Sequence, residues 1–138
     1  MAPQVACLSP FDESTVRGLF PGRAIEVALV PAPPAQQAVY DACHLAHLVI
    51  ADSRQSHRVD RRVLENMRNC LLIQQPGADC SAVDAEAAAE YGIPVAVLPG
   101  GVTSPVEVLA AVSANLNRVL DGAEPHSVVN GVSLGGRP

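Results

Sequence analysis

Residues 70–101, CLLIQQPGADCSAVDAEAAAEYGIPVAVLPGG, carry the pattern that decides the fold. Residues 70–75 form an apolar run of strand length, and Pro76 and Gly77 end it in a tight loop. Ser81 is expected to cap a helix, because residues 85–89 are strong helix formers and acidic side chains stand in the first turn.

The second half of this stretch completes the unit. Gly92 is the usual C-terminal stop of a helix, and residues 93–98 form another apolar run that ends at Pro99. Two buried strands joined by a helix predict a parallel crossover, because parallel strands need a long connection.

Outward from this unit, the chain repeats the same alternation. The other expected strands are residues 5–8, 25–30 and 48–51, and residues 127–130 are expected to form a further short strand. The other expected helices are residues 11–20, 35–46, 60–69 and 104–120. We therefore predict an α/β fold, a flavodoxin-like doubly wound parallel sheet of five strands in the order 2-1-3-4-5 with a long C-terminal helix. Residues 1–130 are expected to form a single domain, and residues 131–138 a loose tail.

The C-terminal helix has a near-ideal start, with Ser104 as cap and Pro105 at the first helical position. Its large apolar residues recur at spacings of three and four; they are Val106, Leu109, Val112, Leu116, Val119 and Leu120. Four of them, Val106, Leu109, Val112 and Val119, span more than one narrow face. Since a monomer rarely leaves such a surface in water, we predict a homodimer through helix 104–120, the alternative being that the domain itself covers the helix.

Composition excludes several classes of function. The 138 residues are 49% hydrophobic and 17% charged, with a net charge of −5, which does not suit a nucleic-acid surface. All nine cationic residues are arginine, so Schiff-base and lysine general-base chemistry are excluded. No apolar run approaches the ~20 residues that cross a bilayer, and the N-terminus lacks the charged region of a signal peptide.

The cysteines and histidines suggest neither a disulfide framework nor a metal site. The four cysteines, Cys7, Cys43, Cys70 and Cys80, contain no C-x-x-C pair, and three lie in or beside apolar segments. Free buried thiols in a cytoplasmic protein are therefore expected. The four histidines, His44, His47, His57 and His126, show no metal-ligand spacing, and no metal is expected.

The motifs of the central stretch also carry a resemblance. Ile73-Gln74-Gln75-Pro76-Gly77-Ala78 is followed by Val83-Asp84, Ala87-Ala88 and Gly92-Ile93-Pro94-Val95. This succession resembles the substrate-domain signature of the D-2-hydroxyacid dehydrogenases. In that family the loop after this strand presents backbone N–H groups to the substrate carboxylate. The chain departs from the family at Asp79, where the family has a second glycine.

The resemblance also implies what this chain lacks. Residues 103–107 resemble the family's outgoing hinge helix, and residues 115–125 with 128–130 resemble its return helix and tail, with only a few residues between them. The family inserts its nucleotide-binding domain at this point, and that domain carries the arginine, glutamate and histidine of hydride transfer. No G-x-G-x-x-G occurs in the sequence. We therefore predict that the chain by itself binds no nicotinamide cofactor.

Ligand binding is expected at the carboxyl ends of the strands. Residues 77–81 face a helix start, where N–H groups favour an anion, the alternative being a purely structural turn. Ser53-Arg54 matches a family loop that contacts substrate in some members, and arginine could grip a carboxylate there or be merely solvated. The candidate substrate-binding residues are Ser9, Arg54, Gly77, Ala78, Asp79 and Ser81.

Catalytic candidates are fewer. Cys80 could be a nucleophile whose pKa a helix N-terminus lowers, although a lone cysteine is more often inert. His57 is the one histidine expected near that site, and Asp79 is the third candidate.

Three functions remain open from the sequence. The first is a binding module that keeps the acid-binding loops and binds a small 2-oxo or 2-hydroxy acid. The second is an enzyme of altered, cofactor-independent chemistry at the same loops. The third is half of a split oxidoreductase, although the short connection between the hinge helices argues against it.

Overall fold

The structure, a computed structural model, describes residues 2–30, 35–53 and 58–133. Its strands are β1 (Gln4–Cys7), β2 (Glu26–Leu29), β3 (Leu48–Ile50), β4 (Leu72–Gln74) and β5 (Val95–Ala96). Its helices are α1 (Glu13–Gly18), α2 (Gln36–His44), α3 (Arg61–Leu64), α4 (Ala85–Glu90) and α5 (Pro105–Leu120). All strand pairs are parallel and the order is β2-β1-β3-β4-β5, which confirms the predicted fold.

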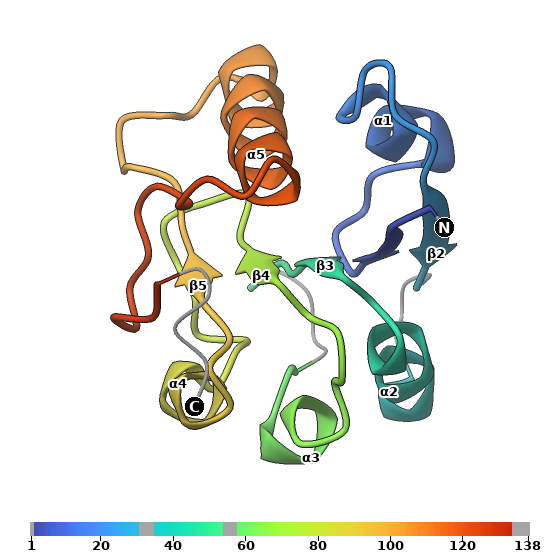
Figure 1. The fold of residues 1–138 in the computed structure, drawn as a ribbon. Coiled ribbons are helices and arrows are strands. Elements are labelled where there is room, and N and C mark those ends of the chain that lie inside the picture. Colours follow the sequence, from blue (N-terminus) through green and yellow to red (C-terminus); the bar gives the residue numbers. More distant parts are fainter. Residues whose placement is uncertain (1, 31–34, 54–57, 134–138) are drawn as a thin grey trace.

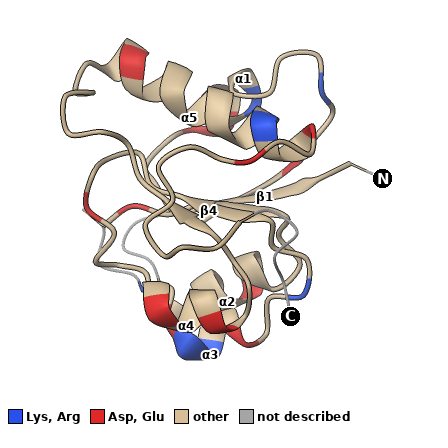
Figure 2. Ribbon diagram, turned by 60° about the vertical axis from the view of Figure 1, so that its left-hand side comes forward, with Lys and Arg blue, Asp and Glu red and all other residues tan. Residues whose placement is uncertain are grey.

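Helices cover both faces of the sheet. Helices α1 and α5 lie on one face, and α2, α3 and α4 lie on the other (Figure 1). Because both faces are covered, the central strands are mainly apolar rather than alternating, and β3 is entirely apolar and fully buried. Charged residues lie on the helices, on the loops and at Glu26 of the edge strand β2, whereas β1 and β4 carry none (Figure 2).

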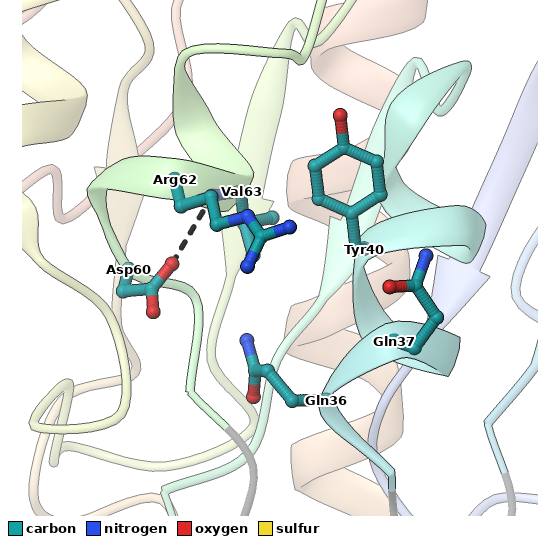
Figure 3. Close-up of a pocket in the computed structure, with 6 residues that line it drawn as sticks. All are labelled: Gln36, Gln37, Tyr40, Asp60, Arg62 and Val63. Carbon is teal, nitrogen blue, oxygen red and sulfur yellow. Dashed lines mark hydrogen bonds between the residues drawn. The ribbon is translucent and has the colours of Figure 1, made fainter.

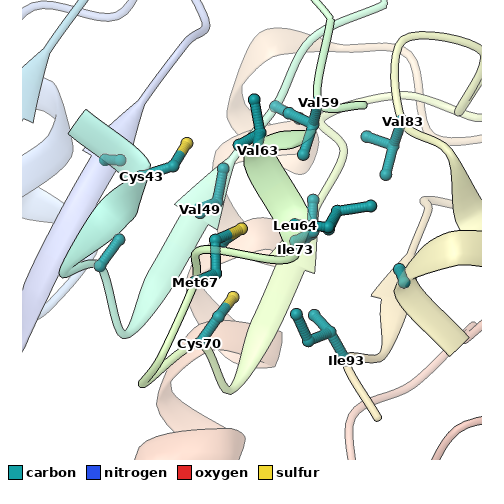
Figure 4. Close-up of a cluster of buried hydrophobic side chains, with 14 of the residues drawn as sticks. Cys43, Val49, Val59, Val63, Leu64, Met67, Cys70, Ile73, Val83 and Ile93 are labelled. Atoms are coloured by element: carbon teal, nitrogen blue, oxygen red, sulfur yellow. The ribbon is translucent and has the colours of Figure 1, made fainter. Parts of the chain in front are cut away.

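The sheet divides the core into two clusters. Val49 and Ile73 point toward α2, α3 and α4, where they pack with Leu64 and Ile93 (Figure 4). Their strand neighbours, such as Leu72, belong to the cluster under α1 and α5. The alternation of side chains along each strand produces this division.

Two helix boundaries agree with the sequence. Ser104 Oγ accepts the backbone N–H of Glu107 at 3.2 Å, and Pro105 is the first helical residue. Gly92 follows α4 at φ +70°, a conformation that L side chains rarely adopt, and Ile93 N donates to Ala88 O at 2.9 Å.

The expected cap of α4 is wrong. Asp84 caps this helix, accepting the N–H of Ala87 at 3.0 Å, and Ser81 lies three residues earlier. Val83 forms a parallel bridge with Val59, and Asp84 N donates to Val59 O at 2.9 Å. Residues 80–83 form a turn in which Val83 N donates to Cys80 O at 3.0 Å, and Val83 then pairs with Val59, so the helix begins only after Asp84.

Several elements are shorter than expected. The helix expected over 60–69 ends at Leu64, because the chain continues in turns in which Asn66 N donates to Val63 O and Met67 N to Leu64 O. The strand expected over 127–130 is a single antiparallel bridge between Val128 and Ala96. Ser127 has a φ of 60°, which breaks the extended backbone before a strand can form.

Helix α5 covers the sheet with part of its apolar surface. Val112, Leu116 and Val119 are buried in the chain's own core, whereas Val106 is 79% exposed. The homodimer through helix 104–120 stays a prediction, and Val106 with the partly buried Leu109 is the apolar surface left for it. Among the described residues, no helix is long and apolar enough to cross a membrane.

Candidate functional site

The loops after β3 and β4 enclose a hollow at the carboxyl ends of these central strands. Its volume is about 200 Å³. The lining residues are Asp52, Ser53, Gln75, Pro76, Gly77, Ala78 and Asp79. In open parallel sheets, ligands bind at this end of the strands, so the position is the expected one.

Ser53 ties the two loops together. Its hydroxyl donates to the carbonyl oxygen of Asp79 at 2.9 Å and accepts the backbone N–H of Ala82 at 3.1 Å. One serine on the β3 loop therefore holds the segment after β4 at two points, Asp79 and Ala82. Leu98 N donates to Gly77 O at 2.9 Å, which holds the start of that segment from the other side.

The segment after β4 leaves backbone donors available. Asp79 Oδ1 accepts the N–H of Ser81 at 2.8 Å, which tightens the turn. In the part of the chain that the structure describes, the N–H groups of Gly77, Ala78 and Asp79 donate to no protein acceptor. Successive free N–H groups in a turn are a recurrent way to bind an anion.

Gln75 contributes a buried donor without a partner. Its side chain lines the hollow and is 1% exposed. Its Oε1 accepts the backbone N–H of Ser53 at 3.2 Å, whereas Nε2 has no hydrogen-bond partner. Turning the amide over would set Nε2 against the Ser53 N–H, donor against donor, so the orientation is determined. An unsatisfied buried donor costs about 1–3 kcal/mol, and a ligand oxygen would recover that cost.

Asp52 forms the wall of the hollow on the β3 side. It is 2% exposed, and its Oδ2 accepts the Ser9 hydroxyl at 2.9 Å. Ser9 is in turn held through its carbonyl, which accepts the Cys7 thiol at 3.4 Å. Burial raises the pKa of Cys7 to about 11, so this thiol is protonated at neutral pH and can serve as that donor.

The structure brings together part of the predicted site. Gly77, Ala78 and Asp79 line the hollow, and Ser9 supports it through Asp52. Ser81 is exposed and outside the lining. The other two candidates, Arg54 and His57, lie outside the described residues.

The cysteines are free thiols, as expected. Cys7, Cys43 and Cys70 are buried, and Cys80 is half-buried against the cluster beneath α2, α3 and α4. Burial raises the pKa of Cys43 to about 12. Among the described residues, no group of three or more His, Cys, Asp or Glu side chains could hold a metal ion.

A second hollow, of about 190 Å³, lies between α2 and α3 (Figure 3). Its polar side chains are largely engaged with the protein itself. Asp60 accepts the N–H of Val63 at 3.1 Å, Gln36 Nε2 donates to Arg58 O at 2.9 Å, and Arg62 lies 5.7 Å from the centre of the Tyr40 ring. In the described lining of this second hollow, no buried side-chain donor lacks a hydrogen-bond partner, in contrast to Gln75 at the first hollow.

The sequence analysis missed Asp52 and Gln75 as site residues. A signal for them existed, because each is polar and directly follows an apolar strand, at the sheet edge where ligands bind. Their roles depend on contacts with Ser9 and Ser53, which are 43 and 22 residues away in the sequence. Spacing alone gives no indication of those contacts.

Residues 5–109 match the sequence model of the D-isomer specific 2-hydroxyacid dehydrogenase catalytic domain. The chain belongs to this family. A comparison with curated proteins found no match.

Solved structures of similar fold agree with this membership. 3-Phosphoglycerate dehydrogenase from Entamoeba histolytica matches 72% of the chain at 21% identity with a TM-score of 0.60. D-lactate dehydrogenase from Escherichia coli matches 70% at 19% identity with a TM-score of 0.54. NAD-dependent formate dehydrogenase from Staphylococcus aureus matches 87% at 16% identity with a TM-score of 0.58.

These likenesses concern the fold alone, because the identities are low. The chain spans 33%, 31% and 41% of the length of those three structures. The similarity therefore covers a minor part of each dehydrogenase, the part that corresponds to a substrate domain in this family.

Proposed function

We propose that this chain is a substrate-domain relative of the D-2-hydroxyacid dehydrogenases that binds a small carboxylate, and that it does not itself perform NAD-dependent hydride transfer. The observation that carries the proposal is the hollow after β4, where the N–H groups of Gly77, Ala78 and Asp79 are joined by the unpartnered Nε2 of Gln75. A carboxylate has two oxygens with about four acceptor sites, and it would take up these donors.

The size of the hollow limits the ligand. At about 200 Å³ it is smaller than the roughly 300–1,000 Å³ of pockets for drug-sized ligands. An acid of a few carbon atoms, such as a 2-oxo or 2-hydroxy acid, fits this scale. Arg54, which follows Ser53 in the same loop, is proposed to add a cationic contact to the carboxylate.

Hydride transfer needs a binding site for a nicotinamide cofactor. The described lining of the hollow instead provides backbone and side-chain amide donors suited to a small acid. The sequence contains no glycine-rich dinucleotide fingerprint. The proposal therefore assigns ligand binding to this chain and assigns no redox step to it. Titration calorimetry with NADH and NADPH checks this part, and micromolar affinity for either would contradict it.

The binding test is a thermal-shift and calorimetric panel of pyruvate, glyoxylate and both enantiomers of lactate. A ligand at 100 times its dissociation constant should stabilise the chain by about 2.7 kcal/mol. In the variant Gln75→Met the dissociation constant should rise about tenfold, since one hydrogen bond to a charged group is lost.

Gln37→Met is the matched control, because it makes the same chemical change on α2, outside the hollow. Its affinity should equal that of the wild type. Two results would contradict the proposal: equal affinities of Gln75→Met and the wild type for the acids, or no stabilisation by any acid of the panel.

A further inference from the structure

The charge of the described lining favours a ligand that carries a positive group in addition to its carboxylate. Its described lining contains two carboxylates, Asp52 and Asp79, and no cationic side chain. Asp52 is already hydrogen-bonded to Ser9, so the charge that faces an incoming ligand most openly is that of the exposed Asp79. A 2-oxo acid would bring a further negative charge beside it, and like charges brought together weaken binding.

Asp79 is nevertheless placed as a ligand-contacting group. Its Oδ1 accepts the Ser81 N–H at 2.8 Å, which holds the carboxylate against its own loop. No hydrogen bond to the other oxygen, Oδ2, is formed by the described residues. The same residue supplies one of the free backbone N–H groups, so a donor for an anion and an acceptor for a cation belong to one residue of the loop.

Gln75 is the second, independent sign of a ligand here. Its Nε2 is buried, lacks a partner and belongs to a residue that lines the hollow beside Asp79. A ligand therefore needs an acceptor oxygen near Gln75 Nε2, and it can carry a positively charged donor group near the Asp79 carboxylate. Burial of an unpaired amide is costly, so a ligand that supplies the acceptor is favoured.

From these groups we infer that the hollow binds a zwitterionic 2-amino acid in preference to the corresponding 2-hydroxy or 2-oxo acid. The inference rests on the proposed carboxylate binding. The ligand's carboxylate accepts from Gln75 Nε2 and the N–H groups of residues 77–79, and its ammonium group donates to Asp79. An ammonium donor is preferred to a hydroxyl, because its positive charge attracts the Asp79 carboxylate in addition to the hydrogen bond, whereas a hydroxyl is uncharged.

Calorimetry with alanine and lactate tests this preference, because the two share a carbon skeleton and differ in ammonium against hydroxyl. Both enantiomers of each are titrated. Alanine should bind about tenfold more tightly than lactate, or 1.4 kcal/mol. Because Asp79 is exposed, the ratio should fall between low and physiological ionic strength.

A variant at Asp79 can remove the negative charge while keeping the hydrogen bond that shapes the loop. In Asp79→Asn, which keeps the oxygen that accepts the Ser81 N–H, alanine and lactate should bind within about twofold of each other, and lactate should bind more tightly than to the wild type. Asp41→Asn on α2, outside the lining, is the control and should leave the ratio unchanged.

The outcomes distinguish this inference from the proposed function. Lactate or pyruvate binding at least as tightly as alanine would overturn the amino-acid preference and leave carboxylate binding intact. An unchanged ratio in Asp79→Asn would overturn the role of Asp79. If none of the ligands bound, both proposals would be wrong.

Discussion

Gln74 and Gln75 are neighbours at the end of β4 and are equally buried, but their side-chain amides differ in how many hydrogen bonds they form. The Gln74 amide is used at both ends: Nε2 donates to the Gln75 carbonyl at 2.8 Å, and Oε1 accepts from Asn115 Nδ2 at 2.6 Å. The Gln75 amide is used at one end only, through Ser53. The comparison separates a polar group that serves the fold from one that is left available for a ligand.

The Gln74 side is a complete network. Asn115 on α5 also accepts the N–H of His126 at 2.6 Å and donates to its carbonyl at 3.1 Å, so one buried amide fastens the segment after α5 to the sheet. Fully satisfied buried networks of this kind rigidify a fold. The Gln75 side, with one donor unsatisfied, carries a cost that a bound ligand oxygen would offset.

Breaking the complete network should have the largest effect. Asn115→Leu leaves Gln74 Oε1 and the His126 N–H without their partner, and each unsatisfied buried group costs about 1–3 kcal/mol. We expect the free energy of unfolding to fall by about 3 kcal/mol, measured by urea denaturation. Asn66→Ala, which removes one exposed hydrogen bond to Arg62 O, is the control and should stay within about 0.5 kcal/mol. A loss as small as that of the control would show that the network is unimportant for stability.

The two glutamines themselves give a matched pair with a smaller effect. Gln74→Met should lower the free energy of unfolding by about 1–2 kcal/mol, because Asn115 loses an acceptor. Gln75→Met should leave it within about 0.5 kcal/mol, since the lost Ser53 contact is offset by removal of the unsatisfied Nε2. Urea denaturation of both variants without ligand provides the measurement. Equal losses would mean that the two amides are equally engaged, and the distinction between them would fail.

Loss of the hydrogen bond between Ser9 and Asp52, which positions one wall of the hollow, should have the smallest effect. Ser9→Ala removes a hydroxyl that donates to the buried Asp52, and we expect a loss of about 1 kcal/mol in unfolding free energy with weaker ligand binding. Ser113→Ala, which removes a part-buried hydroxyl bond to Leu19 O, is the comparison for stability and should leave ligand affinity unchanged. Unaltered affinity in Ser9→Ala would mean that Asp52 does not depend on Ser9 for its position.

The sequence predicted the fold better than the site. Strand order followed from alternating apolar runs and helical patterns, and the start of α5 followed from Ser104-Pro105, because these signals are local. The loop at Gly77–Asp79 followed from the family's motif and its position after an apolar strand. The residues that complete the site, Asp52 and Gln75, depend on partners distant in the chain.

The sequence by itself determined the order of elements, the glycine- and proline-rich loops that end the two strands of the central unit, and the mainly apolar character of the buried strands. Only the tertiary structure decided that Asp84 rather than Ser81 caps α4, because Ser81 lies in a turn and the pairing of Val83 with Val59 places Val83 outside the helix. It also decided which of two adjacent glutamines is satisfied. Side chains of neighbouring residues along an extended chain point to opposite faces, so Gln74 contacts Asn115 under α5, while the Gln75 side chain is hydrogen-bonded to Ser53 through Oε1 alone.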